Sequence, residues 1–170
     1  VNSNIVNSFS NYLIGNTVDS MVYCVVDNQR CSLGSGEGLS HYTYFVAPWG
    51  INSPDAGTYD NPFKTIKYAI SRAVSGNTIC LLDGVYKNNA NSEINIDKNI
   101  TLVGLGDVTF SRANEKVMFY IKEWGNLVIK NVDITVSNTD FHDNVFNVAG
   151  GNLTLINTTV HNIVSSEFIY

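Results

Sequence analysis

The chain has 170 residues, of which 44% are hydrophobic and 15% are charged, and its formal net charge is −5 at neutral pH. This length and apolar content are enough for one domain with a hydrophobic core. Ten lysine and arginine residues, scattered over an acidic chain, provide no basic patch, so we exclude a nucleic-acid-binding protein.

Residues 1–41 form an apolar N-terminal extension. Two strands are predicted in it, at residues 5–14 and 21–26, followed by a loop with Gly34, Gly36 and Gly38. The extension carries too few charges for a disordered tail, so it must be buried against something. We expect an assembly or packing segment that precedes a main domain at residues 42–170.

The start of the chain and its apolar runs bear on localisation. The first residue is Val1, and no charged segment followed by an apolar one resembles a secretion signal, which indicates a processed mature protein or a fragment. No apolar run reaches the length of about 18 residues that a membrane-spanning helix needs, so we expect no transmembrane segment.

Three cysteines are present. Cys24 and Cys31 flank a polar turn and are candidates for a local disulfide, whereas Cys80 lies in an apolar run and is predicted to be a buried small hydrophobe. No Cys-x-x-Cys motif and no nearby pair of histidines supplies the further ligands that a zinc site needs. We therefore predict no metal site and no cofactor.

The segment 42–86 is predicted to contain a strand, a loop, a helix and a second strand. The strand covers residues 42–46, and a loop rich in proline and glycine follows. Apolar residues then recur at helical spacing, which predicts an amphipathic helix over about residues 62–75, with Asp60 or Asn61 as N-cap, Pro62 in the first turn and Gly76 after the last. Residues 78–82 form a buried strand that ends at Asp83 and Gly84.

The rest of the chain repeats. Asn126 aligns with Asn152 and, one copy earlier, with Asn99, which gives a period of about 26 residues that contains only short strands. Such a repeat is typical of a solenoid, in which each rung buries its apolar face against its neighbours. Leu127 with Leu153, Ile129 with Leu155 and Ile134 with Val160 are expected to point inward. Asn131 and Asn157 are expected to form a ladder of turn amides with left-handed φ.

The first half of the main domain resembles a known family. The stretches YFVAP at 44–48, GT at 57–58, NPFKTI at 61–66 and GNTI at 76–79 are similar to the opening of right-handed parallel β-helix proteins of the pectin-lyase-like type, although Asn77 stands where that pattern more often has Asp. The resemblance extends from about residue 42 to the end. It implies an all-β solenoid, a right-handed parallel β-helix capped at its N-terminal end by one short amphipathic helix.

Within this family the asparagine-rich stretch NLTLINTTV at 152–160 most resembles the adhesin-like surface proteins of methanogenic archaea. That resemblance implies a secreted, extracellular protein of the cell surface, structural or adhesive, without catalysis. Three asparagines begin N-x-Thr sequons and are glycosylation candidates, but a structural role in turns is favoured for them: Asn99, Asn152 and Asn157.

Many β-helix proteins cut polysaccharides, so a polysaccharide lyase or glycoside hydrolase is the alternative function, together with a glycan-binding module. Lyase and hydrolase chemistry both need acidic residues in register on neighbouring rungs. We expect Asp107 to have no second acid in register and Asp133 to face Thr159, and the cluster around Asp140, His142 and Asp143 to be a solvated loop. Arg112 and His161 lack acidic partners, so no catalytic residue is predicted. Candidates for stacking on sugar rings are Trp49, Tyr59 and Trp124.

The two ends of the predicted stack differ. The helix at about 62–75 is expected to cover the front, whereas the chain stops at the back on what resembles the first strand of a new rung. Either the chain is a fragment of a longer repeat protein, or another molecule completes that rung. The apolar N-terminal strands are candidates to do so by strand addition, which would give a head-to-tail homopolymer. The expected partner is therefore the protein itself or, alternatively, cell-surface or cell-wall glycans. The candidate assembly residues are Ile5, Val6, Phe9, Tyr12, Ile14, Phe168, Ile169 and Tyr170.

Overall fold

The computed structural model describes residues 21–25, 42–87, 89–112, 116–136 and 145–162, and these residues form thirteen strands and one helix. In chain order the elements are β1 (Met21–Val25), β2 (Tyr44–Val46), α2 (Ile66–Arg72), β3 (Asn77–Leu81), β4 (Gly84–Lys87), β5 (Ile94–Ile96), β6 (Asn99–Gly104), β7 (Val108–Arg112), β8 (Phe119–Ile121), β9 (Asn126–Lys130), β10 (Asp133–Val136), β11 (Phe146–Val148), β12 (Asn152–Ile156) and β13 (Thr159–Asn162).

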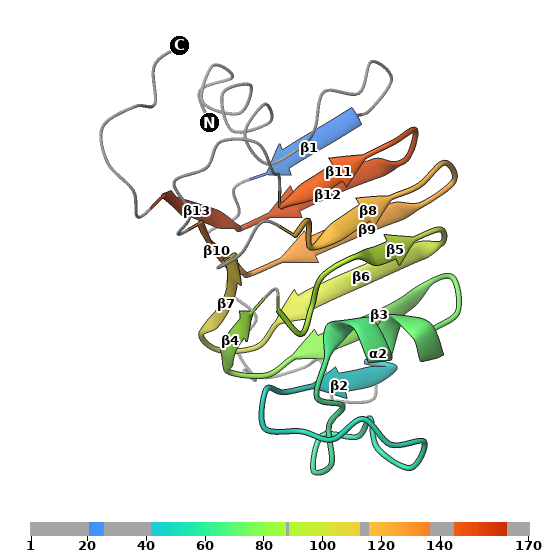
Figure 1. The fold of residues 1–170 in the computed structure, drawn as a ribbon, viewed down its shortest axis with the longest axis vertical. Coiled ribbons are helices and arrows are strands. Elements are labelled where there is room, and N and C mark those ends of the chain that lie inside the picture. The colour runs from blue at the N-terminus through green and yellow to red at the C-terminus, as the bar shows by residue number, and fades with distance from the viewer. Residues whose placement is uncertain (1–20, 26–41, 88, 113–115, 137–144, 163–170) are drawn as a thin grey trace.

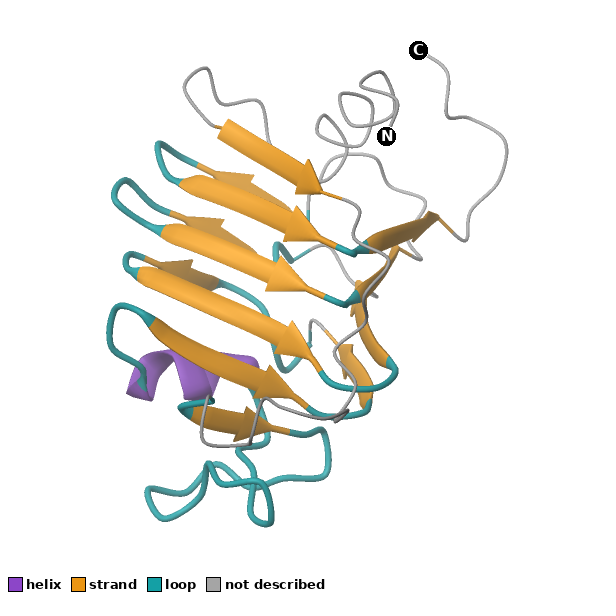
Figure 2. Cartoon of the chain, turned by 180° about the vertical axis from the view of Figure 1, so that it is seen from behind, coloured by secondary structure: helices purple, strands orange, loops and turns teal. Residues whose placement is uncertain are grey.

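The strands build three parallel sheets (Figures 1 and 2). The large sheet has the order β1-β12-β9-β6-β3-β2, the middle sheet the order β13-β10-β7-β4, and the small sheet the order β11-β8-β5. From β5 onward the chain visits the small, large and middle sheets in turn, so each pass adds one strand to each sheet. We call one such pass a rung. The protein is therefore an all-β, solenoid-like stack of parallel strands with one short helix.

The register of the stack follows the sequence repeat. Asn152 pairs with Asn126, and Asn126 pairs with Asn99, which confirms the predicted alignment of the three copies. Within β9 and β12 burial alternates, so that Leu127, Ile129, Leu153 and Leu155 face the core. Ile134 is buried too, and its partner Val160 packs against the core while only half-buried. The period-two pattern of these strands thus sets which face is inside.

An aromatic column runs through the core. The rings of Tyr86, Phe110, Phe119 and Phe146 follow one another with centroid separations of 6.1, 5.7 and 5.5 Å. All four side chains are almost fully buried. Phe110 and Phe119 each lie between two other rings, and Tyr86 and Phe146 end the column, so the contacts tie successive rungs together.

The helix is shorter than predicted and begins later. It spans Ile66–Arg72, and Thr65 is its N-cap, because the Thr65 side chain accepts a hydrogen bond from the Tyr68 amide. Asp60, Asn61 and Pro62 lie in the preceding loop, where Phe63 forms an isolated parallel bridge with Val46. Phe63 lies in that bridge, and the Asn61 carbonyl accepts from the Gly57 and Thr58 amides, so no helix starts before Thr65 and the predicted N-cap and first turn were wrong.

The C-terminal end of the helix also differs from the prediction. The C-cap is Ala73 in an extended conformation, and Gly76, with φ of 91°, belongs to the turn that enters β3. The Gly76 amide donates to the Asn99 carbonyl at 2.7 Å. The positive φ of Gly76 therefore serves the link between two rungs and not the helix end.

The helix covers one sheet at the front end of the stack, which is the end that carries β2. It packs against β2 and β5, at the free side of the small sheet. The large sheet ends instead on β2 and the loop behind it, where the Ala47 amide donates to the Phe63 carbonyl and the Phe63 amide to the Phe45 carbonyl. The predicted lid is thus a helix and a loop together.

Candidate functional site

The turn that leads from the large sheet to the middle sheet repeats along the stack and carries a column of polar side chains. Because Gly84 pairs with Val108 and Asp133 pairs with both Thr109 and Thr159, the residues Asp83, Asp107, Asn131 and Asn157 follow one another in register. We call these four residues the turn column. Its members repeat from rung to rung at the same turn.

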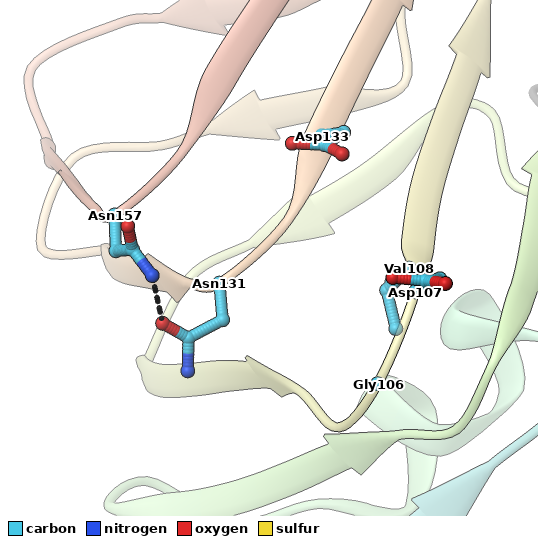
Figure 3. A pocket seen from close by; sticks show the side chains of 6 residues that line it. All are labelled: Gly106, Asp107, Val108, Asn131, Asp133 and Asn157. Atoms are coloured by element: carbon cyan, nitrogen blue, oxygen red, sulfur yellow. Dashed lines mark hydrogen bonds between the residues drawn. The ribbon is translucent and has the colours of Figure 1, made fainter. Parts of the chain in front are cut away.

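The asparagine half of the turn column is the predicted ladder. Asn131 and Asn157 have φ of 56° and 47°, which is the left-handed region that asparagine tolerates better than most residues. The Asn157 Nδ2 donates to the Asn131 Oδ1 at 2.8 Å, as the dashed line in Figure 3 marks. Both expected features, left-handed backbone and amide bonding between rungs, are confirmed.

The acidic half of the turn column corrects an expectation. Asp107 does have an acid in register, because Asp83 precedes it by one rung and its Oδ1 accepts a hydrogen bond from the Asp107 amide at 2.6 Å. Asp133 does pair with Thr159, as predicted, and the Thr159 hydroxyl donates to its carboxylate. Sequence reasoning missed Asp83 because it compared copies at a period of about 26 residues, whereas these two rungs are shorter.

A shallow pocket lies beside the turn column (Figure 3). It is lined by Gly106, Asp107, Val108, Asn131, Asp133 and Asn157. Its free space is about that of one water molecule, which is too small for a sugar ring. At this pocket the Asn131 Oδ1 accepts a hydrogen bond from the Asn157 Nδ2, and the Asp133 carboxylate accepts one from the Thr159 hydroxyl, so these side chains join neighbouring rungs at the turns.

The other ionisable candidates are separated from one another. Arg112 is buried in β7, so it cannot reach a substrate from the outer surface. His161 is exposed in β13 opposite Thr135, and Asp97 is exposed after β5. Among the described residues no group of three or more histidine, cysteine or acidic side chains converges on a point that could hold a metal ion. Asp140, His142 and Asp143 lie outside the described residues.

Exposed aromatic side chains occur at two separate places. Trp49, Ile51 and Tyr59 belong to the loop after β2 and are 66%, 55% and 39% exposed. We call these three residues the front patch. The Tyr59 ring contacts the Phe45 ring edge-on at 5.6 Å, which holds one member of the patch against the front end.

Trp124 forms the second place, in the turn between β8 and β9. It is 83% exposed and has φ of 70°. One rung later the residue in register is Gly150, whose φ is 86°. The turn geometry suits glycine, so a bulky tryptophan there carries a backbone strain of about 1–3 kcal/mol. Nearby, the Lys122 Nζ lies 4.9 Å from the centroid of the Tyr120 ring.

The remaining predicted residues fall into three groups. Asn99 is exposed, whereas Asn152 and Asn157 are half-buried, and the Asn157 amide nitrogen that a glycan would occupy is engaged in the turn column. Cys80 is buried in β3, as predicted. Cys31 and all eight candidate assembly residues lie outside the described residues, so the disulfide between Cys24 and Cys31 and the assembly role of those residues stay predictions.

The back end of the stack holds the one strand of the N-terminal extension that the structure describes. β1 pairs in parallel with β12 over five residues, from Met21 opposite Asn152 to Val25 opposite Ile156. In the described part of the chain β11 and β13 each have a partner on one side only. The two ends of the stack are therefore different: the front is closed by α2 and the loop after β2, and the back receives a strand from the other end of the sequence.

Comparisons with protein-family models, with curated protein sequences and with solved structures found no match to this chain. No described helix is long and apolar enough to cross a bilayer.

Proposed function

We propose that this chain is a right-handed parallel β-helix of the pectin-lyase-like type that acts as a secreted structural or adhesive protein of the cell surface, without catalysis. It is of the adhesin-like kind found in methanogenic archaea, and it assembles head to tail by strand addition. The stack of three parallel sheets supports the fold, since each pass of the chain contributes one strand to each sheet.

The pairing of β1 with β12 is the observation that carries this proposal. The outer strand of a sheet presents unpaired N–H and C=O groups that invite another strand. Here the last rung takes a strand from a distant part of the sequence, over five residues in parallel register. A surface that accepts one remote strand is suited to head-to-tail growth, because contacts between unlike ends do not close on themselves.

We assign the front patch to the other side of this contact, facing the back end of the neighbouring copy. It exposes apolar side chains at the front of the stack, and Trp49 and Ile51 are more than half exposed. Burial of such side chains against a neighbouring copy is favourable, at about 25 cal/mol for each Å² of apolar surface removed from water. In a head-to-tail assembly these residues meet the back end of the next copy.

Sedimentation velocity and electron microscopy of the intact chain test self-assembly. We expect oligomers or filaments whose size grows with protein concentration. The double variant Trp49→Ser, Ile51→Ser is expected to shift the chain toward monomers, whereas the control Trp124→Ser leaves assembly unchanged because Trp124 lies away from both ends. A strictly monomeric protein at high concentration would contradict self-assembly.

A glycan-binding module is the second candidate, and the strained, exposed Trp124 favours it. A ring held outward against its backbone preference is suited to stack on a sugar face. Retention on cell-wall polysaccharide, measured by depletion from solution, is expected to fall for Trp124→Ser and to persist for the control Val85→Ser, an exposed apolar residue of β4. The appearance of reducing or unsaturated sugar ends during incubation would instead indicate an enzyme.

A further inference from the structure

β1 and β2 are consecutive among the described strands, but they lie at opposite edges of the large sheet. The order β1-β12-β9-β6-β3-β2 puts the first strand on the back edge and the second strand on the front edge, as the blue and cyan arrows in Figure 1 show. The only described strand that pairs with β1 is β12. β1 is therefore joined to its own stack by one edge and one connecting segment.

The connecting segment, residues 26–43, is much longer than the pairing requires. From β1 to β2 the large sheet spans five strand separations of about 4.8 Å, which gives a height of about 24 Å. A chain of this length reaches about 60 Å when it is extended. The segment can thus bring β1 to the back of its own stack or to the back of another.

We propose that β1 is an exchangeable strand that pairs with β12 of a second copy of this chain, and that this exchange is the head-to-tail contact. The inference rests on the proposed self-assembly and assigns its donor, residues 21–25, and its acceptor edge, β12. The same backbone hydrogen bonds form within one copy or between two, so exchange requires no new pairing surface. When one copy donates β1 to another, the first copy keeps a free acceptor edge and the second keeps a free donor strand, so further copies can add at both ends.

The protein concentration decides whether β1 pairs with β12 of its own copy or with β12 of a second copy. The connecting segment, through its length, holds β1 near its own β12 at an effective concentration in the range of about 1 mM. A dilute protein therefore pairs β1 within one copy. Crowding at a surface, or additional burial of the front patch against the neighbouring copy, shifts the balance toward exchange.

Cysteine cross-linking of full-length chains tests the exchange. Tyr23 and Thr154 are register partners, and Thr154 is half-buried on the outer side of β12. Paired Cα atoms on adjacent strands lie about 4.8 Å apart, within the range of about 4.4–6.8 Å that a disulfide needs. One chain carries Tyr23→Cys with a size tag, and the other carries Thr154→Cys without it. Both also carry Cys24→Ser and Cys31→Ser, while Cys80 stays because it is buried.

The two chains are co-expressed, oxidised at increasing concentration and separated on a non-reducing gel. We expect a mixed dimer of tagged and untagged chains, because a disulfide between residues 23 and 154 on different chains forms only by exchange. The control partner is Thr101→Cys, which occupies the same column of the large sheet but lies in β6, an inner strand. No mixed dimer above background is expected with it.

Two results would overturn the inference. In the first, the yield of mixed dimer with Thr154→Cys does not exceed the yield with Thr101→Cys, although sedimentation shows oligomers. The protein then self-assembles, but through a contact other than β1 with β12. In the second, neither mixed dimers nor oligomers form, and a single chain with both Tyr23→Cys and Thr154→Cys gives only an internal cross-link, so that the proposed self-assembly fails as well.

Discussion

Asn131 and Asn157 show how single residues stabilise a repeating turn. Both adopt left-handed φ, and their amides are joined across two rungs at 2.8 Å. The repeat made this pair predictable, because residues in register on successive rungs share a turn. The register of Asp83 with Asp107 was not predictable in the same way, because their rungs contain fewer residues than the later ones. The repeat period of the later copies therefore does not align these two residues.

Replacement of Asn131 separates the two contributions of this turn. Asn131→Ala removes the amide acceptor and puts a Cβ-bearing residue without local bonding capacity at positive φ, so we expect a loss of about 2 kcal/mol in the free energy of unfolding. Asn131→Gly removes the hydrogen bond but suits the backbone, so a smaller loss is expected. Equal losses for the two variants in urea unfolding would show that the backbone conformation contributes nothing.

Tyr86 links β4 to β2 at the front end, and it makes the free energy of unfolding depend on pH in the alkaline range. Its hydroxyl lies 2.8 Å from both the Val46 and the Leu82 carbonyl oxygens. Burial raises the pKa of the Tyr86 phenol above its ordinary value of about 10. In the unfolded chain the phenol ionises at that ordinary value, so the contribution of Tyr86 is complete below about pH 10 and declines as the pH rises further.

Unfolding of the wild type and of Tyr86→Phe as a function of pH checks this dependence. At neutral pH the variant is expected to be less stable by about 1 kcal/mol, because two buried carbonyl groups lose a donor. Above about pH 10 the difference is expected to narrow, since only the wild type has this phenol to ionise. A constant difference from pH 7 to pH 12 would mean that the phenol does not couple to unfolding.

At the scale of elements, hydrophobic periodicity predicted whether a segment is a helix or a strand better than it predicted where that helix or strand begins and ends. The apolar stripe correctly indicated an amphipathic helix, with Ile66, Ala69 and Ile70 buried. Its start was misjudged because Asn61 and Pro62 are good helix-starting residues in isolation, whereas Asn61 closes a turn with Gly57 and Thr58, and Phe63 forms a bridge with Val46. Such a tertiary contact has no signal in local sequence. The strands predicted at 21–26, 42–46 and 78–82 came close to the limits of β1, β2 and β3, whereas the strand predicted at 5–14 lies outside the described residues.

The helix depends on one buried amide outside it. Asn91 is 3% exposed, and its Oδ1 accepts from the Ile66 amide at 2.7 Å while its Nδ2 donates to the Lys87 carbonyl at 3.3 Å. Asn91→Ala leaves a buried helix N–H without its acceptor, so we expect a loss of about 1–3 kcal/mol. Hydrogen exchange of the helix amides is expected to accelerate. Asn89→Ala, at an exposed position, is the control and should change neither quantity.

At the scale of the whole molecule, the stack depends on contacts between rungs. The repeat in the sequence predicted the parallel stacking and its register, because in a solenoid each rung meets only its neighbours. An N-terminal strand was expected at the back of the stack, chiefly the one at 5–14, but the sequence left open whether the extension packs on its own copy or reaches a neighbour. Nothing in the sequence between β1 and β2 specifies how far the chain travels.

Phe119 lies in the middle of the aromatic column, between Phe110 and Phe146. Phe119→Ala opens a cavity that touches two further rungs, so we expect a loss of about 3–5 kcal/mol and a lower urea midpoint for the entire stack. The control Tyr120→Ala changes the outer face of the same strand, where the ring contacts Lys122, and should cost about 0.5–1 kcal/mol. Similar losses for the two variants would mean that the column does not hold the rungs together.

The pairing of β1 with β12 also has a consequence for biosynthesis. A ribosome makes residues 21–25 early and residues 152–156 late, so β1 has no pairing edge until nearly all of the described chain has been translated. The inner rungs are free to fold earlier, since their contacts join segments close in sequence, and closure of such a distant pair is slow. During this interval β1 is available to the finished β12 edge of an older chain nearby, so the order of synthesis itself favours exchange between copies.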